Sequence, residues 1–379
     1  MSYVKLILCG GVFFCVYFCA GGAGGDELIG SNLLKEAGLQ SAWQIQLPLK
    51  PSEQVERVDV FEDYLYVLTD RNFFFCIERN TGTVRDLLQI AVAGLPVLPP
   101  IHFEKKSVFL VGQELKIFDP AIGRITQTMK LSQLSGSYGG IARNGGFIYI
   151  CGSDNRLYAF SAEKGKEEVC LFMATAANDS PIHSVLATET MAMVWFGTTA
   201  GNIVAIESTN PRKIWQFDLS GDMVAPLVLD AGFIYAAGLD SKVYKIDSVK
   251  GTLAWEMPFL AGDAIRDPLT LGKTCVYVYA ANTGLHAVDK ETKKEVWPAL
   301  VNGRAVLAEK DSLAYVYVQP GILTLMDGAT GKENLSINIA GVDRFAVNMT
   351  DSVLYLADKK GRVMAAEPIP ESKPGAAKP

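Results

Sequence analysis

Few residues of this 379-residue sequence could perform acid–base or metal chemistry, since only three are histidines. His102 and His183 each follow a Pro-Ile pair at the start of an expected innermost strand, so both could face a central channel and bind a metal ion there. The alternative, which we favour, is one repeated position that carries histidine twice. His286 is expected to pack. No Ser/His/Asp or Cys/His set can be assembled, so we expect no catalytic residue and no metal site.

Three arginines offer a different chemistry. Arg266, Arg304 and Arg344 each lie eleven residues before a tyrosine. Guanidinium groups repel one another, so a cluster of them is rarely kept for stability alone. One hypothesis is a binding point for a carboxylate or acidic loop of a partner protein. The other is that each arginine pairs with an acid, either on the adjacent residue, as with Asp267 or Asp343, or in the next repeat. The tyrosines are Tyr277, Tyr315 and Tyr355.

The cysteines show no metal-binding spacing. Three of the seven fall within the first 19 residues, and no CxxC pair occurs among the others, so a zinc site is not expected. We expect the remaining four to be buried free thiols in apolar strands. These are Cys76, Cys151, Cys170 and Cys275.

Residues 1–25 resemble a secretory signal peptide. Lys5 precedes an apolar run at 6–18, and small residues follow. The run is shorter than the roughly 20 residues of a membrane span. Cys19 is a candidate lipid-acceptor cysteine, although the bulky Phe18 departs from the usual pattern. Cleavage near Ala23 and a retained leader are the alternatives, and export is expected in each case.

A short strand built around an aromatic residue recurs along the rest of the chain. Its eight copies are spaced 38–46 residues apart, which is typical of a repeat architecture. The copies are YVLT (66), FLVG (109), YICG (149), WFGT (195), YAAG (235), YVYA (277), YVYV (315) and YLAD (355).

Each copy is followed by a second strand and a turn. In KIDSVKGTLAWEM the turn has Asp247, Gly251 four residues later and Trp255 four after that. Aspartate bonds backbone N–H groups two residues on, and glycine tolerates positive φ. The tryptophan offers a broad face for docking on the next unit. We expect this docking role for Trp43, Trp215, Trp255 and Trp297.

Four strands in each of eight repeats predict an all-β fold, an eight-bladed β-propeller of four-stranded antiparallel blades. The last repeat lacks a fourth strand. The N-terminal stretch around Trp43 is expected to supply it and close the ring. The predicted organisation is a leader with a Gly-rich tether at 1–25, a propeller at 37–367 and a disordered tail at 368–379.

The Asp–x3–Gly–x3–Trp pattern resembles the PQQ-type propeller repeat. That family includes quinoprotein dehydrogenases and BamB-type lipoproteins of outer-membrane assembly. The resemblance to the dehydrogenases would imply a vicinal cysteine pair, a calcium site and long insertions between blades. The sequence has no Cys–Cys dipeptide and little length for insertions, so we expect no bound quinone and no other cofactor.

These patterns favour a non-catalytic, exported scaffold that binds other proteins, as in BamB-type outer-membrane assembly. We expect a monomer in the periplasm or at the outer membrane of a bacterium, with membrane contact only through a lipid anchor or an uncleaved leader. The net charge of −6 and the lack of a basic block argue against a nucleic-acid partner. The alternative is a quinoprotein-type or carbohydrate-binding enzyme that uses the mouth of the central channel.

Overall fold

The computed structural model describes residues 27–370 except residues 164 and 167. The predicted leader at 1–25, with Cys19, lies outside the described residues. So does most of the predicted tail, from residue 371 onward. Among the residues described, none forms a helix long and apolar enough to cross a membrane.

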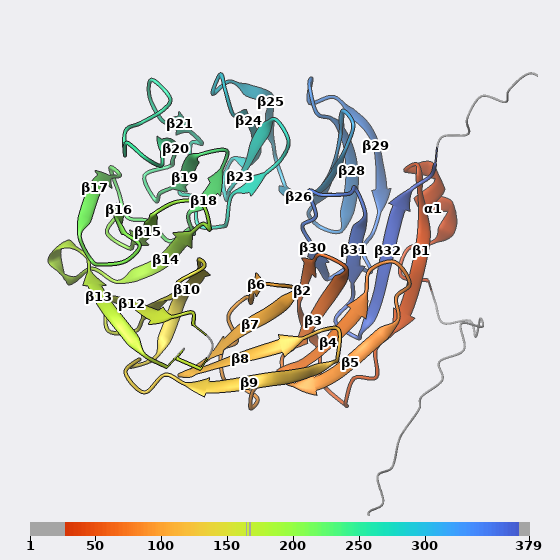
Figure 1. The fold of residues 1–379 in the computed structure, drawn as a ribbon. Coiled ribbons are helices and arrows are strands. Elements are labelled where there is room, and N and C mark those ends of the chain that lie inside the picture. The colour runs from red at the N-terminus through yellow and green to blue at the C-terminus, as the bar shows by residue number, and fades with distance from the viewer. Residues whose placement is uncertain (1–26, 164, 167, 371–379) are drawn as a thin grey trace, which may run out of the picture.

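The described chain forms eight four-stranded antiparallel sheets arranged as the blades of a ring (Figure 1). This confirms the predicted eight-bladed propeller. Blades 1 to 4 comprise β2 (Val55–Phe61), β3 (Tyr64–Thr69), β4 (Phe73–Glu78) and β5 (Val84–Gln89); β6 (Ile101–Phe103), β7 (Lys106–Val111), β8 (Glu114–Asp119) and β9 (Arg124–Lys130); β10 (Ser137–Arg143), β11 (Phe147–Gly152), β12 (Arg156–Ser161) and β13 (Cys170–Thr175); β14 (Ile182–Ala187), β15 (Met193–Thr198), β16 (Asn202–Glu207) and β17 (Lys213–Asp218).

A short 3₁₀ turn, Ala177–Asp179, precedes blade 4. Blades 5 to 7 comprise β18 (Val228–Asp230), β19 (Phe233–Ala237), β20 (Lys242–Asp247) and β21 (Phe259–Leu260); β22 (Thr270–Leu271), β23 (Cys275–Ala280), β24 (Gly284–Asp289) and β25 (Glu295–Leu300); β26 (Gly303–Lys310), β27 (Leu313–Val318), β28 (Ile322–Asp327) and β29 (Glu333–Asn338).

Blade 8 joins the two ends of the chain. Its inner strands are β30 (Arg344–Ala346), β31 (Leu354–Ala357) and β32 (Arg362–Pro368), and its outer strand is β1 (Leu39–Gln46). β1 runs antiparallel to β32, from Leu39 opposite Pro368 to Gln46 opposite Arg362. The N-terminal strand therefore covers the edge of β32 and closes the ring, as predicted.

A segment that the repeat pattern did not anticipate packs beside blades 7 and 8. It contains the short helix α1 (Ser31–Glu36). Leu28, Ile29 and Leu34 are buried in one apolar cluster with residues of β27 to β32. Burying these side chains fixes the chain just before β1, the strand that closes the ring.

The aromatic residue of each repeat lies buried in the second strand of its blade, and several reach the following blade through their polar tips. The Tyr66 hydroxyl lies 2.8 Å from Ser107 Oγ of blade 2. Trp195 Nε1 donates to the Ser248 carbonyl of blade 5 at 2.9 Å. Such a side chain fills the space between blades and satisfies its own polar atom there.

Trp43 docks on the turn of the next blade around the ring. Its indole Nε1 donates to the Arg79 carbonyl at 2.7 Å. The ring lies so close to Gly82 that a Cβ atom at this glycine would come within 2.6 Å of it. Gly82 also has a φ of 70°, which favours glycine. Trp43 of blade 8 thus packs against blade 1.

Trp215 and Trp297 also pack closely against a turn glycine of the next blade. A Cβ at Gly251 would lie 2.4 Å from the Trp215 ring, and one at Gly331 would lie 1.8 Å from Trp297 Cβ. Trp255 instead faces a turn without glycine, where its Nε1 donates to the Lys290 carbonyl at 3.0 Å. The Asp–x3–Gly–x3–Trp spacing therefore encodes contacts between neighbouring blades.

Blade 3 departs from the sequence alignment. When the repeats are aligned by their turns, Val169 of blade 3 falls at the position of the docking tryptophan. In the structure Phe172 lies opposite Ala159, as Trp215 lies opposite Ala205 in blade 4. The turn of blade 3 is longer, which shifts the docking residue by three positions. Phe172 packs against the core cluster shared by blades 3 and 4.

The antiparallel order gives the ring two distinct faces. The turns after the first and third strands of every blade lie at one face, which we call the hairpin face. The turns after the second strands and the links between blades lie at the other, which we call the connector face. The links are residues 47–54, 90–100, 131–136, 176–181, 219–227, 261–269, 301–302 and 339–343.

Replacing Gly251 by alanine tests the docking contact. We expect Gly251→Ala to lower the free energy of unfolding by about 1 to 3 kcal/mol more than Gly94→Ala, because its methyl group would displace the Trp215 ring. Gly94 is a matched control, since it has a φ of 86° and no atom within 4 Å of its Cβ position. Urea denaturation measures both variants, and equal losses would contradict the contact.

Candidate protein-binding site

The three repeated arginines lie at the connector-face ends of the innermost strands. Arg304 in β26 forms a bidentate ion pair with Asp267, with N–O distances of 2.8 and 3.0 Å. Its guanidinium carbon lies 3.9 Å from the centre of the Tyr279 ring. The hydrogen bonds to Asp267 raise the pKa of Arg304. Arg304 of blade 7 is therefore held against blade 6.

Arg344 and Arg266 are differently placed. Arg344 in β30 donates from Nε to the Glu56 carbonyl of blade 1 at 2.9 Å and from Nη1 to the Asp343 carbonyl at 2.9 Å. Arg266 lies in the link before β22 and is exposed. Within the described residues no hydrogen bond or ion pair involves its guanidinium group.

The ion-pair hypothesis holds for Arg304 alone, and with a different partner from the adjacent one: Asp267 follows Arg266 in the sequence but pairs with Arg304 of the neighbouring blade through two parallel hydrogen bonds. Binding of a partner by the three arginines stays a prediction. Arg344 is oriented by backbone carbonyls, and these leave its charge without an acidic counterion in the part of the chain described. Arg266 is open to solvent. Of the three arginines, Arg266 and Arg344 therefore have no acidic partner among the described residues.

A cavity of about 500 Å³ opens beside Arg344 on the same face. It lies between the link before blade 1, the link before blade 8 and the turn from β31 to β32. Asp343 approaches Lys359 Nζ at 3.9 Å, and Asp358 accepts from Arg362 Nε at 2.7 Å. Lys360 also lines the cavity, so its charged groups are mixed rather than of one sign.

His102 and His183 lie on innermost strands, as predicted, but each is tied to protein groups. His102 stacks on Phe61, and its Nδ1 lies 3.1 Å from Ser107 Oγ. His183 Nε2 lies 3.3 Å from the Ala225 carbonyl. Burial lowers the pKa of His102 to about 3 and also lowers the pKa of His183. Both imidazoles are therefore neutral near pH 7.

His286 lies in β24, with Nδ1 at 2.6 Å from Glu295 and Nε2 at 2.8 Å from Thr283. In the described residues no group of three or more His, Cys, Asp or Glu side chains could hold a metal ion. Cys76, Cys151 and Cys275 are buried free thiols, and Cys170 is partly buried. Burial raises the pKa of each thiol, so none has the character of a reactive thiolate.

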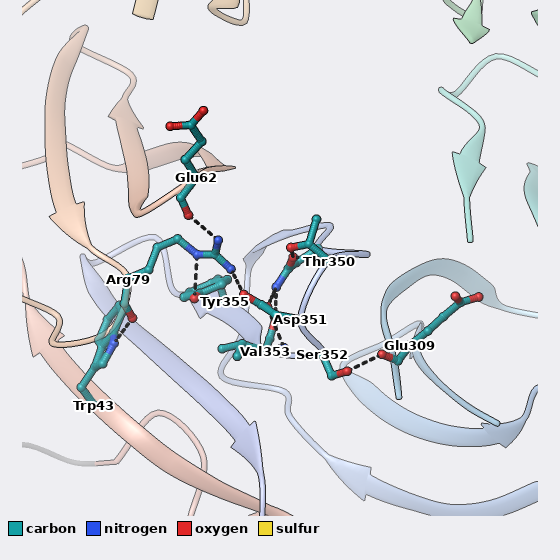
Figure 2. Close-up of polar contacts among 10 residues, drawn as sticks. Trp43, Glu62, Arg79, Glu309, Thr350, Asp351, Ser352, Val353 and Tyr355 are labelled. Atoms are coloured by element: carbon teal, nitrogen blue, oxygen red, sulfur yellow. Dashed lines mark hydrogen bonds and ion pairs between the residues drawn. The ribbon is translucent and has the colours of Figure 1, made fainter. Parts of the chain in front are cut away.

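Sequence reasoning missed Arg79, which joins the first and last blades on the hairpin face (Figure 2). Its side chain is 10% exposed and pairs with Asp351 of blade 8. Its Nε donates to the Tyr355 hydroxyl at 3.0 Å, and Nη1 donates to the Glu62 carbonyl. One guanidinium thus contacts both blades at the closure, beside the Trp43 contact with its own carbonyl.

The turn that carries Asp351 is itself well ordered by hydrogen bonds. Asn348 donates to Asp351 and to the Val353 carbonyl. Ser352 donates to the Glu309 carbonyl of blade 7 at 2.6 Å (Figure 2). Blades 7, 8 and 1 are connected through this turn. No sequence motif marks Arg79, since its two side-chain partners, Tyr355 and Asp351, lie more than 250 residues away.

Comparison with known proteins agrees with this architecture. Residues 199–369 match the model of a family described as outer membrane protein assembly factor BamB. The crystal structure of BamB from Moraxella catarrhalis matches with a TM-score of 0.63 and 13% identity, covering 87% of this chain and 97% of that one. A computationally designed protein, Ika8, matches with a TM-score of 0.65 and 12% identity, covering 84% and 98%.

A curated relative comes from the dehydrogenase branch. It is the quinohemoprotein alcohol dehydrogenase ADH-IIG of Pseudomonas putida, 29% identical over 148 residues. The match covers 31% of this chain and 20% of the relative, so this chain spans only a fifth of that protein's length.

The fold and the repeat contacts define an eight-bladed β-propeller, and its turn motif resembles the PQQ-type repeat. Within that class the chain resembles BamB, whose family model matches its C-terminal half and whose structure shares its fold.

Arg79 provides a test of the closure. We expect Arg79→Ala to lower the free energy of unfolding by about 2 kcal/mol, because it leaves Tyr355 and Asp351 without their charged donor. Arg212→Ala is the control, since Arg212 is 74% exposed and pairs with Glu207 within one turn. Arg212→Ala should lower the free energy of unfolding by no more than about 0.5 kcal/mol. Similar losses in equilibrium unfolding would show that Arg79 is an ordinary surface residue.

His102 should make stability depend on pH. Its folded pKa lies below its unfolded pKa of 6.5, so the unfolded chain binds a proton first and stability falls as the pH drops from about 6.5 toward 3. Between pH 6.5 and 5 we expect a loss of about 2 kcal/mol from this residue. His102→Gln should lack it when unfolding is measured at both pH values. An unchanged pH dependence would refute the assignment.

Proposed function

We propose that this protein is a non-catalytic scaffold that binds other proteins on its connector face and takes part in outer-membrane protein assembly. The observation that carries the proposal is the joint match of sequence and fold to BamB, a family described as an outer membrane protein assembly factor. The rigid ring suits this role, because it holds separate links in fixed positions on one face.

The partner group that fits this face best is a carboxylate or an acidic loop. Arg266 is exposed, and Arg344 has its Nε and Nη1 committed to carbonyls that fix the guanidinium without neutralising it. Guanidinium groups bind carboxylates through two parallel hydrogen bonds. Because the overall charge of the chain is −6, a local cationic site would also orient an acidic partner.

The proposal includes export. The apolar leader at 1–25 would direct the chain out of the cytoplasm, and a lipid on Cys19 would hold it at the outer membrane. If the leader is cleaved near Ala23 instead, the propeller would act in the periplasm. Treating cells with a labelled fatty acid distinguishes these routes, because only the lipidated form retains the label, and Cys19→Ser should abolish it.

Charge reversal tests the binding face. We expect the double variant Arg266→Glu and Arg344→Glu to reduce partner capture roughly tenfold, equivalent to about 1.4 kcal/mol. The measurement is quantitative crosslinking and pull-down from cell envelopes, with Arg212→Glu on the hairpin face as control. Arg304→Glu should also reduce capture, but it breaks the Asp267 pair and so needs a parallel unfolding measurement. Unchanged capture by the double variant would eliminate the proposed face.

A second candidate function is a quinoprotein-type enzyme or a carbohydrate-binding propeller. The partial match to a quinohemoprotein alcohol dehydrogenase favours considering the enzyme. Absorbance spectra and elemental analysis of the purified protein decide this point. The scaffold proposal predicts no stoichiometric quinone or metal. A chromophore or metal at one equivalent per chain would favour the enzyme.

A further inference from the structure

The outer strand of blade 3, β13, differs from the other outer strands of the ring. Its Leu171 and Met173 are 50% and 46% exposed, and Val169, just before the strand, is 44% exposed. Phe172 and Ala174 alternate with these residues and pack into the core toward blade 4. Leu171 and Met173 therefore form an apolar strip on the opposite side of the strand.

The equivalent positions of other blades are mostly polar. The residues on either side of the docking position are Thr126 and Thr128 in β9, and Asn334 and Ser336 in β29. In β17 they are Ile214 and Gln216. In β25 they are Val296 and Pro298. β13 and β25 both have two apolar residues there, but only β13 has no proline, and a proline cannot donate a backbone hydrogen bond to an added strand.

β13 also lacks charge. Residues 169–178 read VCLFMATAAN and contain no acidic or basic side chain. Outer strands commonly carry charges that discourage pairing with another chain. Here β5, β9, β17, β25 and β29 each carry at least one such residue. β1 and β21 carry none, but α1 packs against β1 and β21 is only two residues long.

The free edge of β13 can accept a strand. In its sheet the order is β10-β11-β12-β13, so β13 is hydrogen-bonded along one side only among the described residues. Its outer backbone groups can bond an added strand. A charged residue placed beside Leu171 or Met173 would lose hydration without gaining a counterion, so the added strand must be uncharged there.

We propose that β13 binds an extended segment of another polypeptide, added to blade 3 as a fifth strand. The segment would be uncharged over about five residues and apolar at alternate positions, to match the strip formed by Leu171 and Met173. This site lies on the outer wall of the ring. It is separate from the connector-face arginines and does not depend on them.

A fluorescent peptide of alternating threonine and valine, seven residues long, tests the site by anisotropy with the full chain. We expect saturable binding that weakens at least tenfold in the double variant Leu171→Thr and Met173→Thr. This variant copies the residues of β9, and its exposed positions and high strand propensity should leave unfolding unchanged. Ile214→Thr, at a 40% exposed position of β17, should bind as the unaltered chain does.

Two altered peptides separate strand addition from apolar adhesion. A central proline removes one backbone donor, and aspartate in place of valine introduces charge, so each should weaken binding at least tenfold. Equal binding of the proline peptide, or of the Leu171/Met173 double variant, would overturn the proposal. So would a concentration-dependent dimer that the double variant abolishes, since the occupant would then be a second copy of the chain.

Discussion

The ring depends on aromatic side chains that reach from one blade to the next. A single four-stranded blade cannot cover both of its faces, so each blade gains stability by packing against its neighbours. Indole and phenol groups suit this purpose because they bury a large area and still donate a hydrogen bond. Trp43, Trp195 and Trp255 all donate to a carbonyl in the third-strand turn of the following blade. These contacts between blades therefore recur along the chain with the same spacing as the repeat.

The closure is the one place where chain connectivity cannot hold neighbouring strands together. There β1 pairs with β32, Trp43 packs on Gly82, and Arg79 bonds Tyr355 and Asp351 of the last blade. At the closure the contact between Trp43 and Gly82 is therefore supplemented by the Arg79 guanidinium, which bonds the last blade. β1 and β32, near the two ends of the described chain, thus pair within blade 8, and Arg344 of that blade bonds the Glu56 carbonyl of blade 1.

Much of this fold could be predicted because the repeat signal is local in sequence. The eight aromatic strands and the Asp–x3–Gly–x3–Trp turns indicate eight blades, and the orphan Trp43 indicates the closure. Features that depend on three-dimensional proximity could not be predicted. Phe172 was missed because a longer turn displaced it, and Arg79 because its partners lie at the other end of the chain. The pairing of Arg304 with Asp267 could not be predicted either, because the two residues belong to neighbouring blades and lie 37 residues apart.

The central claim is that contacts between blades, rather than the strands of each blade alone, hold the ring closed. Native-state hydrogen exchange of Trp43→Ala tests it most directly. We predict that amides in β2 to β5 of blade 1 and in β30 to β32 of blade 8 lose protection together, since both blades share the contact. Loss of protection confined to β1, with blade 1 unchanged, would contradict the account.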